Sequence, residues 1–353
     1  DTFLLDSRFR TPDYGAALYH ESTYDAGRWR FTAGLRVDFE ASKLHYRSYA
    51  EATYTTQTPD GTSYPHAILV DQPGTLKQSF TEILPKISVL YRMGSSRRNT
   101  LYATVSKGYK AGGFNTQMFS DVLQQQVMKQ MGFGSLYDVA DVVTYKPEKS
   151  WNYEIGIRSE LLFQRLSAEL TGFYMDIQDV QLTKFVNSGN GRILTNAGKA
   201  KSYGIEASLR ARIIDGLTAD VNYGFTHATF RDYNNGKEDF KNNFIPYTPR
   251  HTFNVGLQYT RLFRNAWIDQ FSASAQFSGV GKIFWTERND IYQKFYGTVN
   301  AKVGVRKGIV NVNLWSRNIT NTHYSAFYFE SFGNPFIQLG KPFQIGAEVA
   351  IAF

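Results

Sequence analysis

Histidine, glycine and cysteine are the residue types that decide whether this sequence could support catalysis or metal binding. The six histidines stand apart, and no HExxH or other paired spacing for a metal ion occurs. There is no cysteine, so no thiolate site is available. No GxSxG elbow occurs, and no nucleotide-binding pattern follows Gly112-Gly113. The sequence therefore predicts a protein that is not an enzyme and that has no cofactor or resident metal.

Aromatic residues with cations or amides close by form a second group of candidates. Aromatic residues make up 16% of the chain, and several lie between the regular parts of the sequence. Ring faces can stack on an aromatic ligand and cations can bind an anionic one. Packing of these segments on themselves would use the same residues. The candidate ligand-binding residues are Tyr109, Lys110, Phe114, Asn115, Trp285, Arg288, Phe327 and Phe329.

The regular parts of the sequence alternate between apolar and polar residues, which is typical of half-exposed β-strands. Between 217 and 226, for example, Leu217, Val221 and Phe225 share one face, and polar residues occupy the other. About thirteen such strands occur, many of about 10 residues, the length that crosses a bilayer at a tilt. They are expected near 15–25, 28–40, 78–94, 98–110, 149–160, 164–178, 201–213, 216–231, 249–262, 267–281, 294–307, 309–319 and 342–353.

The connections between these strands are alternately short and long. The long ones are 41–77, 111–148, 179–200, 232–248, 282–293 and 320–341. A transmembrane barrel has short periplasmic turns and long extracellular loops, whereas a soluble sandwich has no reason to alternate. The pattern predicts an all-β, transmembrane, antiparallel meander β-barrel. In the loops we expect continued strands turning at 59–61 and a short helix at 120–130, capped by Ser120-Asp121.

Charged residues fall opposite the apolar faces of the predicted strands. They should line the lumen, because a charge on the lipid side costs about 2–4 kcal/mol near the midplane. Such a wall either contacts a plug or forms part of a substrate path. The net charge of +8 comes from scattered Lys and Arg without a basic run, which argues against nucleic acid as a partner. The expected lumen-wall residues are Arg36, Glu154, Arg158, Glu206 and Arg210.

Several segments resemble one family of outer-membrane proteins. The last strand ends an apolar face on an aromatic residue and looks like an assembly signal, carried by Phe343, Val349, Ile351 and Phe353. The segments at 32–38, 84–87, 106–115, 146–158, 195–206 and 318–321 resemble the TonB-dependent receptor family and occur in the family's order. The resemblance implies that residues 1–353 form the C-terminal part of a 22-stranded barrel, without the plug domain.

The resemblance also implies a function in the bacterial cell outer membrane. It implies active, TonB-dependent uptake of a scarce ligand, most often a ferric siderophore, with haem, cobalamin or oligosaccharide as other candidates. Iron would enter only as part of a transported chelate. The implied partners are the TonB–ExbB–ExbD system acting through the plug segment, the barrel assembly machinery, lipopolysaccharide and a small-molecule chelate.

Two other functions compete with this expectation. A passive porin-like channel of about 12 to 16 strands would also fit the chain length. A soluble all-β binding module would need strands of only about 5–6 residues. With an odd number of strands, the first and last run in the same direction. We therefore expect no pairing between residues 16–24 and 343–353, and a continuous ladder there would favour the passive channel.

Overall fold

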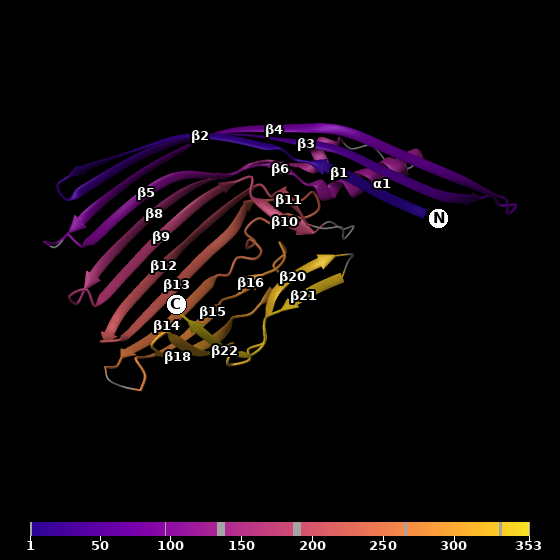
Figure 1. The fold of residues 1–353 in the computed structure, drawn as a ribbon. Helices are drawn as coiled ribbons and strands as arrows, with labels where there is room; N and C mark the ends of the chain where they lie inside the picture. The colour runs from indigo at the N-terminus through magenta and orange to yellow at the C-terminus, as the bar shows by residue number, and fades with distance from the viewer. Residues whose placement is uncertain are drawn as a thin grey trace.

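The main element of the fold is one curved antiparallel sheet in which successive strands pair with each other (Figure 1). The computed structural model describes residues 2–95, 97–132, 138–185, 192–264, 267–331 and 334–352. The sheet has 14 strands in thirteen positions, because β1 (Thr2–Arg10) and β2 (Asp13–Ala26) pair with different parts of β3 (Trp29–Gln57). The expected meander of about thirteen strands is confirmed.

The remaining strands of the sheet follow in chain order and lie close to the expected ranges. β1 was not predicted, since three consecutive apolar residues from Phe3 to Leu5 break the alternation. The remaining strands are β4 (Ser63–Met93), β5 (Asn99–Lys110), β8 (Glu148–Leu161), β9 (Leu166–Gln178), β12 (Lys199–Ile214), β13 (Leu217–Asp232), β14 (His251–Leu262), β15 (Gln270–Val280), β18 (Tyr296–Lys307), β19 (Val310–Arg317) and β22 (Gln344–Ile351).

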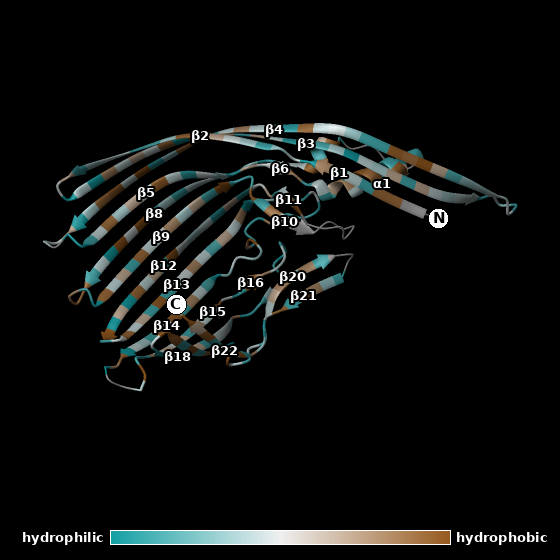
Figure 2. Cartoon of the chain, in the orientation of Figure 1, coloured by the Kyte–Doolittle hydropathy of each residue, from teal (hydrophilic) through white to brown (hydrophobic). Residues whose placement is uncertain are grey.

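The two faces of the sheet differ in chemistry. Figure 2 shows apolar and polar residues alternating along the strands. Apolar side chains such as Ile87 and Ile345 are 67% and 71% exposed. The opposite face carries ion pairs such as Arg158–Glu169. One face is thus suited to lipid and the other to a polar lumen.

The long connections contain their own small elements. The hairpins are β6 (Gly113–Phe114) with β7 (Thr144–Tyr145), β10 (Gln181–Phe185) with β11 (Arg192–Asn196), β16 (Ile283–Phe284) with β17 (Tyr292–Gln293), and β20 (Ser325–Ser331) with β21 (Asn334–Leu339). The helices are η1 (Thr116–Met118), α1 (Phe119–Gln130) and α2 (Val139–Val143).

Helix α1 matches the expected helix, but its predicted cap is wrong. The N-cap is Met118, which makes no side-chain capping hydrogen bond, and the Ser120 hydroxyl donates instead to the carbonyl of Gln117. The reason is that η1 runs directly into α1, so the helical backbone begins before Ser120. The expected continuation of the strands in 41–77 is confirmed, because β3 and β4 pair without interruption up to Gln57 and Ser63.

Both edges of the sheet are open in this chain. Within the part of the chain that the structure describes, β2 pairs only with β3, and β22 pairs only with β19. No ladder joins the described residues of 16–24 and 343–352. The observed edges agree with the sequence expectation and do not favour a small closed channel.

Candidate ligand-binding site

An aromatic cavity of about 280 Å³ lies among four of the long connections. Trp285 and Tyr328 are almost fully buried beside it. Burial, helped by a hydrogen bond to Glu330, raises the pKa of Tyr328 to about 12, so its hydroxyl stays neutral at physiological pH. The lining residues are Leu182, Thr183, Pro246, Tyr247, Trp285, Thr286, Glu287, Tyr328, Phe329 and Glu330.

Tyr247 joins the aromatic residues of this cavity. Its ring stacks on Phe327 with 5.4 Å between centroids and meets Trp285 at 5.6 Å. Phe327 in turn contacts Phe329 at 5.9 Å. The structure therefore brings together three residues proposed from sequence, Trp285, Phe327 and Phe329. Sequence reasoning missed Tyr247, which lies in the loop 232–248.

The backbone of Tyr247 is strained. Its φ is +61°, a value that bulky residues rarely adopt. The strain is offset by a hydrogen bond from the Tyr247 hydroxyl to the Tyr328 carbonyl at 2.9 Å, and by a backbone bond from its N–H to the Phe284 carbonyl at 2.8 Å. Strained residues held in this way are concentrated at ligand sites.

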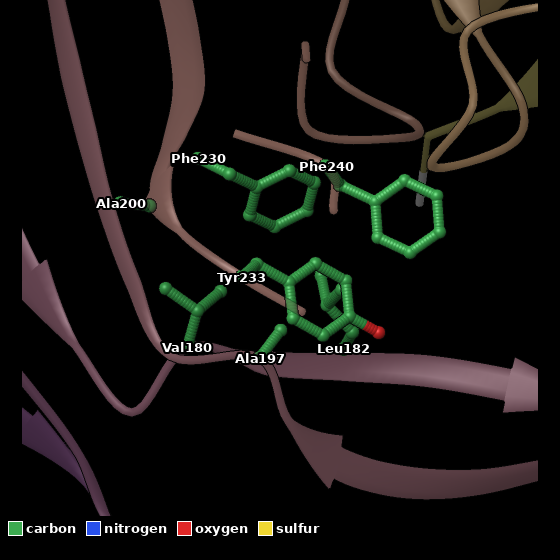
Figure 3. Packing of buried hydrophobic residues seen from close by; sticks show 7 residues of the cluster. All are labelled: Val180, Leu182, Ala197, Ala200, Phe230, Tyr233 and Phe240. Atoms are coloured by element: carbon green, nitrogen blue, oxygen red, sulfur yellow. The ribbon is translucent and has the colours of Figure 1, made fainter. Parts of the chain in front are cut away.

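A buried cluster supports one wall of the cavity. Figure 3 shows Phe230, Tyr233 and Phe240 packed over Val180 and Leu182. The rings of Tyr233 and Phe240 lie 5.2 Å apart. Leu182 belongs both to this cluster and to the cavity lining. Packing of the loop 232–248 on β10 thereby fixes the wall that Leu182 provides.

Arg288 lies near this site, but its charge is compensated. Its guanidinium donates two hydrogen bonds to the Glu238 carboxylate, at 2.7 and 2.6 Å. The guanidinium lowers the pKa of Glu238. The pair connects the loops 232–248 and 282–293. Arg288 was proposed to bind an anionic ligand, but its charge is already neutralised by Glu238.

The other candidate residues make contacts outside the aromatic cavity. The Tyr109 hydroxyl donates to Glu40 at 2.7 Å, and Lys110 pairs with Glu148 at 2.7 Å. Asn115 bonds the backbone of Leu194 through both its amide nitrogen and its amide oxygen. Phe114 packs on the cluster under α1 and lines a second cavity of about 510 Å³. These four residues do not line the aromatic cavity.

Three of the five expected lumen-wall residues, Arg36, Arg158 and Arg210, form ion pairs on the polar face. Arg158 bonds Glu169 at 2.8 Å, and Arg210 lies 3.4 Å from Asp220. Arg36 bonds its own neighbour Asp38 at 2.6 Å. These ion pairs neutralise much of the charge on the wall.

Glu206 lines a groove of about 540 Å³ on the same face. Unlike Arg158, it has no ion-pair partner within the described ranges. Small polar residues, including Ser208, Asn222, Asn254 and Ser278, line the same groove. The groove offers hydrogen-bonding groups together with the carboxylates of Glu169 and Glu206. The fifth wall residue, Glu154, sits opposite Thr104 in the β5–β8 ladder.

The proposed assembly residues lie on the edge strand or next to it. Val349 and Ile351 of β22 are 64% and 51% exposed, and Phe343 is 46% exposed. Phe353 lies outside the described residues. No helix in the described ranges is long and apolar enough to span a membrane. The same residues contain no cluster of potential metal ligands.

Comparison with known families decides the class of this sheet. The model of the family described as TonB dependent receptor-like, beta-barrel matches residues 3–321. The chain belongs to the TonB-dependent receptor family. Its members are outer-membrane transport receptors, so the resemblance noted from the sequence is confirmed.

Individual TonB-dependent receptors are similar to this chain over much of its length. The pesticin receptor of Yersinia pestis is 25% identical over 283 residues, which cover 78% of this chain and 37% of that protein. The ferric yersiniabactin uptake receptor FyuA from Yersinia pestis has a TM-score of 0.73 at 20% identity and covers 99% of this chain and 47% of that one. The ferric-catecholate import receptor Fiu from E. coli, in its closed form, has a TM-score of 0.64 at 18% identity, with 98% and 45% covered. The chain thus spans less than half the length of these proteins.

Proposed function

We propose that this chain is part of a receptor that takes up a ferric siderophore in a TonB-dependent manner. The aromatic cavity formed by Tyr247, Trp285 and Phe329 carries the proposal, because it offers ring faces to a ligand at the loop end of the sheet. The names of the similar receptors FyuA and Fiu refer to iron chelates and support the same ligand class. Iron would arrive inside the chelate, so the protein needs no metal site.

The cavity favours contact with the organic part of the ligand. Four of its lining residues are aromatic, while the nearby Arg288 is engaged by Glu238. Ring stacking is worth about 0.5–1.5 kcal/mol per pair beyond burial of area. A ligand with aromatic or planar groups therefore fits better than a compact anion.

Transport also needs parts that the described residues do not form. We propose that a plug segment couples the receptor to TonB–ExbB–ExbD, and that the barrel assembly machinery recognises β22. Both sheet edges run in the same direction, so an antiparallel closure requires an odd number of further strands. Closure with a family plug inside would place that plug against the groove lined by Glu206.

The test is uptake by cells that produce the complete receptor containing this chain. Trp285→Leu and Phe329→Leu remove ring faces but keep apolar volume, and each should lower uptake of an iron-55 catecholate chelate at limiting concentration about tenfold. Trp267→Leu is the matched control, because Trp267 is 90% exposed in a short turn. Uptake should also be lost in cells that lack TonB.

Two outcomes would contradict the proposal. Uptake independent of TonB would indicate a passive channel. Unchanged uptake in both cavity variants, with normal amounts of receptor in the outer membrane, would show that the cavity is not the binding site.

A further inference from the structure

The second cavity, of about 510 Å³, lies between strands β2, β3 and β4 and the turn that leads into β6. Its volume is within the range of about 300–1,000 Å³ that is typical of small-molecule sites. Among the described residues that line it are two carboxylates and four aromatic rings, and no basic residue. These acidic and aromatic residues are Asp13, Glu40, Tyr14, Phe80, Phe114 and Tyr145.

The two carboxylates lie at diagonal positions on the polar face of the sheet. In the β2–β3 ladder, Asp13 lies opposite Ser42. The next pair on that face is Gly15 with Glu40. Side chains at diagonal positions are close enough to interact, so two carboxylates there repel each other. The hydrogen bonds that they accept come from neutral hydroxyls, from Tyr109 to Glu40 at 2.7 Å and from Ser42 to Asp13.

The protein does not compensate this negative charge. Asp13 and Glu40 make no ion pair with any residue in the described ranges. A third acceptor beside the cavity is also unsatisfied. The Nε2 of Gln78 donates to the carbonyl of Gly113 at 3.4 Å, while its Oε1 is buried without a donor from the described part of the chain. The surroundings of the cavity are therefore rich in negative charge and in acceptors.

Aromatic rings form much of the remaining wall. Phe80 lies opposite Glu40 in the β3–β4 ladder. The turn at Gly112 packs directly on this ring, because a Cβ at that position would lie 2.7 Å from Phe80 Cζ and 2.5 Å from the carbonyl oxygen of Tyr145. Burial, together with the negative charge of Asp13, raises the pKa of Tyr145, so its hydroxyl stays neutral. The shape of this wall is thus fixed by packing.

We propose that this cavity binds an organic cation, the protonated or quaternary ammonium group of a small molecule. Aromatic faces attract such a group through the ring quadrupole, and the carboxylates attract it by charge. An inorganic cation would leave the rings unused, and Ca²⁺ takes about six to eight oxygen ligands, more than two carboxylates supply. The inference goes beyond the proposed uptake, because a cation can bind here whether or not the receptor transports a chelate.

The test compares two probes of the same shape on the purified, complete receptor in dodecyl maltoside. Choline carries a quaternary ammonium, and 3,3-dimethylbutan-1-ol has a neutral carbon in its place. Isothermal titration calorimetry should show that choline binds at least about tenfold more tightly than the neutral alcohol, because only the charged probe gains from the rings and the carboxylates.

Two variants and one control locate the binding. Glu40→Gln should weaken choline binding about tenfold and leave the alcohol unaffected, because glutamine keeps an acceptor for the Tyr109 hydroxyl but has no charge. Phe80→Leu keeps apolar volume, removes a ring face and should also weaken choline binding. Glu51→Gln is the matched control and should change nothing. Glu51 lies on the same strand and accepts a hydrogen bond from Tyr49 at 3.0 Å, but it does not line the cavity.

Equal binding of choline and the alcohol would overturn the inference. Unchanged choline affinity in Glu40→Gln and Phe80→Leu, with wild-type melting temperatures, would overturn it as well. If another part of the complete receptor fills the cavity, neither probe binds there, and that result also rejects the site. Displacement of choline by Ca²⁺, at an ionic strength matched with NaCl, would reject the assignment to an organic cation. None of these results bears on chelate uptake, which the Trp285→Leu variant and cells lacking TonB test separately.

Discussion

Tyr247 shows how one residue can connect loops that lie far apart in the sequence. Its hydroxyl reaches the carbonyl of Tyr328, 81 residues away, and its ring contacts both Trp285 and Phe327. The ion pair between Arg288 and Glu238 joins two of the same loops by charge. The site is thus held by specific contacts of Tyr247 and Arg288 in addition to the buried clusters around Leu182 and Trp285.

The Arg288–Glu238 pair predicts a pH dependence at the residue scale. The folded pKa of Glu238 is lowered by Arg288, so the pair stabilises the docked loops above the unfolded glutamate pKa of about 4.3. This contribution should be lost as the pH falls through the lower, folded pKa. Limited proteolysis of the loops 232–248 and 282–293 between pH 7 and pH 3 measures it.

Glu238→Gln is the control for this pH effect. The variant cannot ionise at position 238, so its loops should be equally protease-sensitive at neutral pH and in the window just below pH 4.3. A wild type and variant with the same pH profile would contradict the role of the pair. High salt should weaken the effect, because both side chains are largely exposed.

At the scale of elements, helix α1 and the β3–β4 hairpin stabilise each other. The upper half of the hairpin extends beyond β5, since the β4–β5 ladder ends at Lys86 and Ser106, and β1 is the one further strand that pairs with it among the described residues. A sheet of three strands needs an apolar face packed on another element to be stable in water. The buried Leu123 and Val127 of α1 cover Ala50 and Ile68 of this small sheet.

Leu123→Ala should loosen this part of the structure. Leu123 is fully buried, and such a truncation costs about 2–5 kcal/mol through lost burial and the cavity left behind. Amide hydrogen exchange should accelerate in 44–57 and 63–76 and stay unchanged in β8 and β9. Met128→Ala is the control in the same helix, because Met128 is 51% exposed. Equal exchange in both variants would show that α1 does not support the hairpin.

At the scale of the whole molecule, the sheet has a short-turn end and a loop end. β3 and β4 stay paired up to Gln57 and Ser63, well beyond the β4–β5 ladder, whereas β5 begins at Asn99, shortly after β4 ends at Met93. The aromatic cavity and α1 both lie among the long connections. Ligand capture is therefore proposed at one end only, with the polar face of the sheet below it.

This polarity predicts which end faces the outside of the cell. Ser63→Cys at the loop end should react with a membrane-impermeant maleimide on intact cells, whereas Ser95→Cys at the short-turn end should react only after the outer membrane is permeabilised. Both serines are exposed, and the chain contains no cysteine that would add background. Labelling of Ser95→Cys alone on intact cells would mean that the orientation is reversed.

The sequence by itself determined the strands of the main sheet other than β1, their faces and the alternation of short and long connections. These follow from the period-two pattern, which is a local property of the chain and is imposed by lipid on one side and water on the other. It also indicated Trp285, Phe327 and Phe329 as candidate ligand contacts, because aromatic residues in the predicted loops can be recognised from the sequence alone. Only the tertiary structure showed that Tyr247 links them, that Arg288 is engaged by Glu238, and that Tyr109 and Asn115 make contacts elsewhere. Contacts between loops depend on which distant segments lie together in the fold, and a local sequence pattern does not predict this.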